Sequence, residues 1–161
     1  MGQRVDDFDG FFDDNYGSTL RAVSMAIGDP GRAEDLTQEA FARAFRRWST
    51  VSKLERPVAW VYVVALNAER KRWRRERNAP EPQTQNGSVP DVAAGVLSTI
   101  VVRDALARLP ARQRAAVVLR YLGDLTVADI ANVMGCAEGT VKATLHQALR
   151  NLRVDLDGSE P

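Results

Sequence analysis

Residues 125–146 read Leu125-Thr-Val-Ala-Asp-Ile-Ala-Asn-Val-Met-Gly135, followed by Cys136-Ala-Glu-Gly-Thr-Val-Lys-Ala-Thr-Leu-His146. Thr126 with Asp129 three residues later is a variant of the capping box, which opens a helix. Gly135 is the residue type that most often ends a helix in the left-handed conformation. The stretch therefore predicts a short helix, a glycine turn and a last helix from about 138 to 154. This order is the helix-turn-helix arrangement.

The second helix of this motif has one apolar and one polar face. The apolar face contains Val141, Leu145, Ala148 and Leu152. The opposite face contains Ala143, His146, Gln147 and Arg150, with Thr140 and Lys142 at its edges. Amide, hydroxyl and cationic groups on a helix that enters the major groove are suited to base edges and phosphates. The pattern favours DNA binding, and the alternative is an ordinary helical hairpin with a solvated polar face.

Two amphipathic helices are predicted near the N-terminus. Apolar residues at three- and four-residue steps predict the first, from about Phe8 to Ile27, before the break at 28–31. The second, from about 32 to 48, has an apolar side that contains Leu36, Ala40, Phe41, Ala44, Phe45 and Trp48. Its polar side contains Asp35, Gln38, Glu39, Ala42 and Arg46. The acids on this side serve either solubility or the docking of another protein.

A third helix is predicted from Pro57, which suits a first helical turn, through the basic end of the segment at Arg77. Residues 58–66 are apolar all round, which indicates burial between the first two helices. A strand is the alternative, but the helix formers in residues 67–77 favour a helix. Trp60, Asn67, Lys71 and Arg74 fall in one narrow sector of it. Aromatic, amide and cationic groups together favour single-stranded or melted nucleic acid, and the alternative is a solvated helix end.

The fold class is therefore all-α, with two small helical domains joined by a flexible linker. Residues 79–93 contain three prolines and almost no core-forming residues, which is typical of a linker. We expect the first domain to span residues 1–78 and the helix-turn-helix domain to span residues 94–161. In the second domain, helices are also expected over residues 97–109 and 111–122.

Composition excludes several classes of protein. The chain has 161 residues, of which 45% are hydrophobic and 27% charged, as in globular proteins. One cysteine and one histidine cannot form an internal disulfide or a Cys/His metal site, and neither a catalytic residue nor a cofactor is predicted. No membrane-spanning stretch, signal peptide or transit peptide is recognisable, so we expect no membrane insertion and a cytoplasmic protein.

The net charge of +1 conceals two blocks of opposite charge. Residues 1–45 carry a balance of −5, whereas residues 46–78 carry a balance of +7. Such asymmetry indicates separate partners for separate surfaces.

Three segments, in order, resemble the extracytoplasmic-function (ECF) sigma factors of the sigma-70 family. They are Ala33-Glu-Asp-Leu-Thr-Gln-Glu-Ala-Phe-Ala-Arg-Ala-Phe45, then Pro57-Val-Ala-Trp-Val-Tyr-Val-Val-Ala-Leu-Asn-Ala68 with the basic run after it, and the stretch from Leu109 to Lys142. The resemblance covers nearly the whole chain. The short length of the chain, and its 19 arginines against 3 lysines, resemble the members of the actinobacterial branch of this family.

The resemblance implies that the protein binds core RNA polymerase, recognises two promoter elements, assists melting and directs transcription initiation without catalysis. It implies that polymerase is bound, at the β′ clamp helices and the β subunit, by Asp35, Gln38, Glu39 and Arg43. It implies that the −10 element is contacted by Trp60, Asn67, Arg70, Lys71 and Arg74. It also implies that the loop 49–56 holds a flipped −10 base. It assigns to the −35 element Thr140, Lys142, Thr144, His146, Gln147 and Arg150. An anti-sigma factor is a further partner that the two-domain design permits.

Some positions depart from the family pattern. Ala137 stands where a serine is common, and Ala143-Thr144 stands where Ser-Arg is common. An arginine is also common in the family near the position of Gln147. These departures bear on the sequence preference for the −35 element.

Three alternative functions remain: a stand-alone helix-turn-helix regulator, an interaction protein that mimics a sigma factor, and an enzyme.

Overall fold

Helices form all the regular structure in the part of the chain that the computed structural model describes, residues 2–77 and 97–157. In chain order the elements are α1 (Gly2–Ile27), α2 (Pro30–Arg46), α3 (Trp48–Val51), α4 (Pro57–Leu66), η1 (Asn67–Glu69), α5 (Arg70–Arg77), α6 (Leu97–Arg108), α7 (Ala111–Tyr121), α8 (Val127–Met134) and α9 (Glu138–Asp157). The predicted all-α class is confirmed. The predicted linker, residues 79–93, lies outside the described residues.

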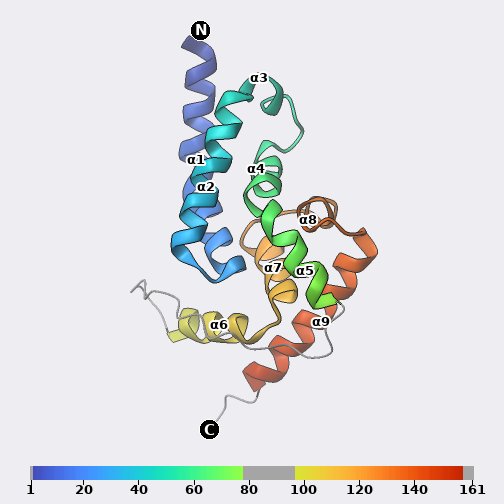
Figure 1. The fold of residues 1–161 in the computed structure, drawn as a ribbon. Helices are drawn as coiled ribbons and strands as arrows, with labels where there is room; N and C mark the ends of the chain where they lie inside the picture. Colours follow the sequence, from blue (N-terminus) through green and yellow to red (C-terminus); the bar gives the residue numbers. More distant parts are fainter. Residues whose placement is uncertain (1, 78–96, 158–161) are drawn as a thin grey trace.

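Helices α1 and α2 lie side by side (Figure 1) and pack through aromatic side chains. Phe8 of α1 meets Trp48 edge to face at 5.4 Å between ring centroids, and Phe12 meets Phe41 in the same way at 5.4 Å. Asp29 caps α2 by accepting from the backbone N–H of Arg32, and proline occupies the first turn. Phe45, predicted in the core, is 51% exposed although its ring still touches Phe8.

Helix α4 confirms the helical prediction for residues 58–66 and corrects the expected all-round burial. Its buried residues, Val61, Tyr62, Ala65 and Leu66, face α1, α2 and α8. Val58, Ala59, Trp60, Val63 and Val64 are only half-buried. An apolar sequence shows that a helix has much to bury but does not show how many neighbours it has.

The sequence predicted one continuous helix from Pro57 to Arg77. The structure corrects this prediction, because the basic segment is separate from α4. A 3₁₀ turn, η1, separates α4 from α5. At this turn Glu69 is buried and pairs with Arg32 of α2, with Arg72 also 3.9 Å away. The tighter turn thus coincides with a carboxylate that turns inward to meet a cation of another helix.

The C-terminal domain has the predicted helix-turn-helix after two earlier helices. Pro110 separates α6 from α7 and occupies the N-cap position of α7. Helix α7 is the most buried of this domain, with seven of its residues in the interior, and it packs against α9.

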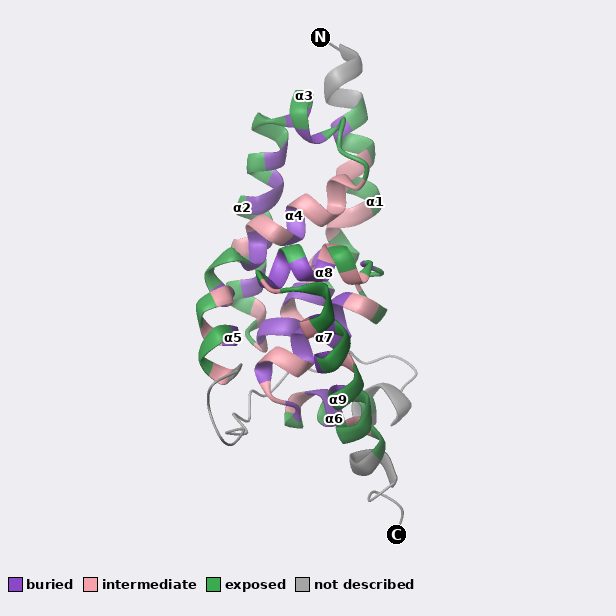
Figure 2. Cartoon of the chain, turned by 90° about the vertical axis from the view of Figure 1, so that its right-hand side faces the viewer, coloured by how far each residue is buried: buried purple, intermediate pink, exposed green. Residues whose placement is uncertain are grey.

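The two domains pack against each other over one continuous core. Helix α7 packs against α1, and α8 packs against α4 (Figure 1). The buried cluster includes Val23, Val61, Val118 and Ile130, which come from both domains. Figure 2 shows the buried segments of α2, α4 and α7 in the interior, with exposed segments around them.

Candidate polymerase and nucleic-acid interfaces

The helix-turn-helix is fixed by caps that its own sequence supplies. Thr126 Oγ1 accepts from Asp129 N at 3.1 Å, and Asp129 Oδ2 accepts from Thr126 N at 3.2 Å, so the capping box is complete. Gly135 ends α8 in the left-handed conformation, with φ at 67°. Both local predictions are confirmed, and they set the direction in which α9 leaves the turn.

The outward face of α9 is open to solvent. Lys142, His146, Gln147 and Arg150 are exposed, and Thr140 is half-buried. Thr144, by contrast, is 7% exposed and its Oγ1 donates to the carbonyl oxygen of Thr140 at 2.7 Å. The structure therefore turns Thr144 toward the interior, and the candidate −35 surface consists of the other five residues.

Helices α4 and α5 present the aromatic and cationic groups that the sequence placed together. Trp60 is half-buried, whereas Asn67, Lys71 and Arg74 are exposed. A cavity of about 390 Å³ lies beside Trp60 and is lined by Arg43, Arg46, Arg47 and Val64 as well. The end of α2 thus brings three guanidinium-bearing residues to the aromatic ring. Arg46 and Arg47 were missed as site residues because they lie far from Trp60 in sequence.

Arg70 lies apart from the open cationic face. Its Nε donates to the carbonyl oxygen of Val133 at 2.9 Å, and Nη2 donates to that of Asn132. Both carbonyls lie at the C-terminal end of α8, where acceptors lack partners within the helix. A cation is favoured there by the helix dipole.

The polar side of α2 is exposed at Asp35, Gln38 and Glu39. Arg43 Nε donates to Glu39 Oε1 at 2.9 Å, and Arg46 Nη2 lies 3.3 Å from the same oxygen. The hydrogen bond from Arg43, reinforced by both positive charges, lowers the pKa of Glu39 from its ordinary value. Gln38 Nε2 donates to Glu34 Oε1 at 3.2 Å. The face thus combines the carboxylate of Asp35 with a second carboxylate already paired with cations.

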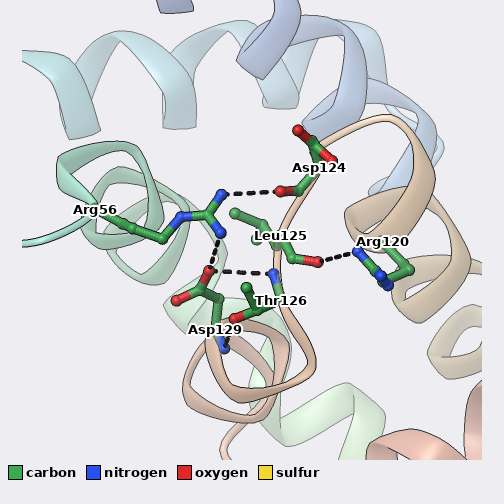
Figure 3. A network of polar contacts seen from close by, with 6 residues as sticks. All are labelled: Arg56, Arg120, Asp124, Leu125, Thr126 and Asp129. Atoms are coloured by element: carbon green, nitrogen blue, oxygen red, sulfur yellow. Dashed lines mark hydrogen bonds and ion pairs between the residues drawn. The ribbon is translucent and has the colours of Figure 1, made fainter.

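The loop before α4 is tied to the helix-turn-helix (Figure 3). Arg56 Nη1 lies 3.2 Å from Asp129 Oδ2, and Nη2 donates to the carbonyl oxygen of Asp124 at 2.9 Å. Arg120 Nη1 donates to the carbonyl oxygen of Leu125 at 3.0 Å. Asp129 therefore serves both its own helix cap and the other domain.

Other chemistries find little support in the described residues. No group of three or more His, Cys, Asp or Glu side chains there could hold a metal ion. Cys136 is half-buried in the turn. Within the same described ranges, no helix is long and apolar enough to cross a membrane.

Comparison with known proteins assigns both domains. The family model "Sigma-70 region 2" matches residues 12–79, and "Sigma-70, region 4" matches residues 100–152. The "ECF RNA polymerase sigma factor SigL" of Mycobacterium tuberculosis is 36% identical over 152 residues, which cover 90% of this chain and 86% of that protein. The chain belongs to the ECF family of RNA polymerase sigma factors.

A second relative agrees with this assignment of the ECF sigma factor, and a solved structure shares its fold. The "RNA polymerase sigma-E factor" of Streptomyces coelicolor is 31% identical over 97% of this chain and 89% of its own length. The sigma factor RpoE of Bartonella quintana, crystallised with the anti-sigma factor NepR, has the same fold with a TM-score of 0.74. That likeness covers 96% of this chain and 99% of the other, at 23% identity.

Family membership identifies the sigma factor as a transcription initiation factor whose region 4 is a DNA-binding module. Region 2 contains the acidic face of α2 and the aromatic and cationic face of α4 and α5, and region 4 contains α9. The structure therefore gathers most predicted residues on three exposed faces. The exceptions are Arg70, which contacts α8, and Thr144, which is buried.

Proposed function

We propose that this sigma factor binds core RNA polymerase, recognises −35 and −10 promoter elements and assists melting of the −10 element. The observation that carries the proposal is the presence, on one sigma-70 region 2, of two faces: an exposed acidic face on α2, and a face on α4 and α5 that combines the half-buried Trp60 with exposed cations. A stand-alone helix-turn-helix regulator would need neither face. An enzyme would need a reactive cluster, so we propose a non-catalytic factor that acts in the cytoplasm with polymerase.

The acidic face supplies the polymerase contact in this proposal. Asp35, Gln38, Glu39 and Arg43 lie on the exposed side of α2 and would contact the β′ clamp helices, while other surfaces would meet the β subunit. The Glu39 to Arg43 pair is highly exposed, so it is readily exchanged for a pair with a cation of polymerase.

The aromatic and cationic face would hold the separated −10 strand. A base that leaves the duplex costs a few kcal/mol of lost stacking and pairing. Stacking on an aromatic ring recovers about 1–3 kcal/mol per base. Trp60 would provide that ring, Asn67 a base-edge contact, and Lys71 and Arg74 phosphate contacts. Arg46 and Arg47 line the cavity beside Trp60, and their guanidinium groups would contact the phosphate of the same nucleotide.

The exposed face of α9 would read the −35 element in the major groove. Gln147 can make a bidentate contact with adenine, and Arg150 and Lys142 can contact guanine or phosphate. Thr140 and His146 lie on the same side. Without the arginines common in the family, we expect the −35 preference to differ from that of typical relatives.

An anti-sigma factor belongs to the same proposal as a regulatory partner. The Bartonella quintana relative, which has the same fold, was crystallised with one. Co-purification of the full chain from its own cells, with identification of bound proteins, tests this part. Recovery of core polymerase subunits alone would argue against a dedicated anti-sigma factor.

Run-off transcription with core polymerase and a panel of genomic promoters tests the main proposal. The wild-type chain should yield promoter-dependent transcripts, and Asp35→Ala with Glu39→Ala should reduce both polymerase binding and transcript yield. The matched control is Asp13→Ala with Asp14→Ala, which removes two exposed acids from α1. No transcript from any promoter with folded wild-type protein would refute the proposal.

A further inference from the structure

Glu69 is a buried acid at the junction between the aromatic and the cationic parts of the proposed −10 face. It is 2% exposed and lies in η1, between α4, which carries Trp60, and α5, which carries Lys71 and Arg74. Its carboxylate pairs with the guanidinium group of Arg32, in the first turn of α2. A carboxylate that has given up its water in this way needs a cation beside it.

Arg32 is the partner that ties this junction to another helix of the first domain. Arg72 Nη1 also lies 3.9 Å from Glu69 Oε2, but Arg72 belongs to α5 itself, so that contact cannot fix where α5 points. Arg32 is in turn held at the start of α2, where its backbone N–H donates to Asp29 Oδ1 at 3.1 Å. The ion pair therefore joins the junction to the helix that bears the acidic face.

The remaining contacts of α5 are of other kinds. Trp73, one turn after Glu69, is 2% exposed and packs into the apolar core. Arg70 and Glu76 bind backbone atoms of the second domain, at the end of α8 and at the start of α7. Among the described residues of the first domain, the charged contact that orients α5 is thus the pair of Glu69 with Arg32.

The turn at Glu69 rotates the cations of α5 with respect to Trp60. A 3₁₀ helix has about 3.0 residues per turn and an α-helix about 3.6, so each residue of η1 turns the chain by roughly 20° more than an α-helical residue does. Over the three residues of η1 the extra rotation amounts to roughly 60°. Lys71 and Arg74 are therefore displaced around the helix axis from the places they would have on one continuous helix.

We propose that Glu69 is a positioning residue, which acts on the −10 strand through its ion pair with Arg32. The pair holds the turn between α4 and α5, and the turn determines which phosphates Lys71 and Arg74 reach when a base lies on Trp60. Glu69 itself is too buried to touch DNA. The inference rests on the proposed function for its DNA partner, whereas the dependence of the turn on charge can be measured without DNA.

NMR of the full chain tests the turn. Backbone nuclear Overhauser contacts across residues 66–70 should be those of a 3₁₀ turn in the wild type. They should become those of an α-helix in Glu69→Gln, which keeps the size of the side chain and removes its charge. Arg32→Lys retains a cation and should retain the turn. A turn that persists in Glu69→Gln would overturn the proposal, and if that variant unfolds, Arg32→Ala replaces it with the same outcome required.

Oligonucleotide binding to the full chain, measured by fluorescence anisotropy, tests positioning. The probe is a single strand with the −10 element of a promoter that is active in run-off transcription. Replacing one phosphate at a time by a neutral methylphosphonate identifies the phosphate whose loss weakens binding only while Lys71 is present. Glu69→Gln should move that sensitivity to a neighbouring phosphate or abolish it. It should also weaken binding at least threefold, although it removes a negative charge.

Asp9→Asn, at an exposed acid of α1, is the matched control, because it also removes one negative charge. It should bind no more weakly than wild type and should keep the same sensitive phosphate. Weaker binding of Glu69→Gln at an unchanged phosphate would show a merely structural role and overturn the proposal. A wild type that binds no −10 strand would refute the proposed −10 contact and with it the role of Glu69 on DNA, whereas the charge-dependent turn would stand.

Discussion

Arg70 Nε lies 2.9 Å from the carbonyl oxygen of Val133, so the first residue of a strongly basic helix caps the end of α8 in the other domain. Hydrogen bonds from charged groups contribute about 1.5–3 kcal/mol when well shielded, and less at a partly exposed site such as this one. Arg70→Ala should therefore lower the free energy of unfolding by ~1–2 kcal/mol in urea denaturation. Arg70→Lys should recover little, because an ammonium group lacks the fork that reaches two carbonyls. Arg75→Ala, at an exposed neighbour, is the control, and equal losses for both variants would contradict the capping role.

Gly135 is required by backbone conformation and by close approach of the other domain. Its φ is 67°, and an added Cβ would lie 3.3 Å from Arg70 Cδ. Gly135→Ala should cost ~1–2 kcal/mol, since the left-handed region is unfavourable for residues with a Cβ. Gly139→Ala is the control because nothing lies within 4 Å of its Cβ position. Urea denaturation should show no loss for the control, and a loss of similar size there would contradict the explanation.

Ala137 leaves the start of α9 without a side-chain cap. Its carbonyl oxygen accepts from the N–H of Val141 at 3.1 Å, which places Ala137 at the N-cap, but alanine has no oxygen to offer the free amides. Ala137→Ser should raise the free energy of unfolding by ~1 kcal/mol. Ala143→Ser, within the exposed face of the same helix, should instead lower it by a few tenths, because serine is the weaker helix former (~0.5 kcal/mol). Gains at both positions, by thermal or urea unfolding, would show that capping is not the cause.

Glu39 should titrate below the ordinary range of a glutamate. The hydrogen bond from Arg43 lowers its pKa from 4.5. Because the folded pKa is the lower one, the stabilising contribution of the pair is present above the unfolded pKa and is lost as pH falls through the folded pKa. Carboxyl ¹³C NMR should show Glu39 ionised to lower pH than an ordinary glutamate, and Arg43→Ala should return its pKa toward the ordinary value. An unmoved midpoint in that variant would contradict this origin.

Lys71 and Arg74 should contribute counterion release rather than base selectivity. For single strands, the logarithm of the binding constant falls with the logarithm of salt concentration by ~0.7 for each neutralised phosphate. Lys71→Ala and Arg74→Ala should each flatten the slope of −10 oligonucleotide binding by about that amount. Arg21→Ala, on α1, should leave the slope unchanged. A wild-type slope in either α5 variant would exclude its phosphate contact.

Most of the helices, the capping box and the glycine turn could be predicted because each depends on residues close in sequence, whereas the short helix α3 lies within the stretch 49–56 that was expected to be a loop. The positions of Thr126, Asp129 and Gly135 determine where α8 begins and ends, and the structure agrees. The exposed faces of α2 and α9 followed from helical periodicity for the same reason. The η1 turn could not be predicted, because Glu69 turns inward toward Arg32, and nothing local distinguishes it from a solvated acid.

The roles of individual cations were the least predictable part of the candidate site. Arg70 and Lys71 are adjacent and both positively charged, yet one caps α8 and the other faces solvent. Arg46 and Arg47 join Trp60 at a cavity only because α2 and α4 pack together. Likewise, an apolar face does not say which domain covers it, so the docking of region 4 on α4 and α5 appears only in three dimensions.

The contacts that α5 makes with the second domain are unequal in one respect. Glu76 and Arg70 use their side chains, whereas Ala111, Arg112, Asn132 and Val133 use only backbone atoms. A substitution at those four partners leaves their amides and carbonyls in place, unless proline replaces Ala111 or Arg112 and removes the amide. Point mutations should therefore remove these contacts far more often through changes in α5 than through changes at the facing helix ends.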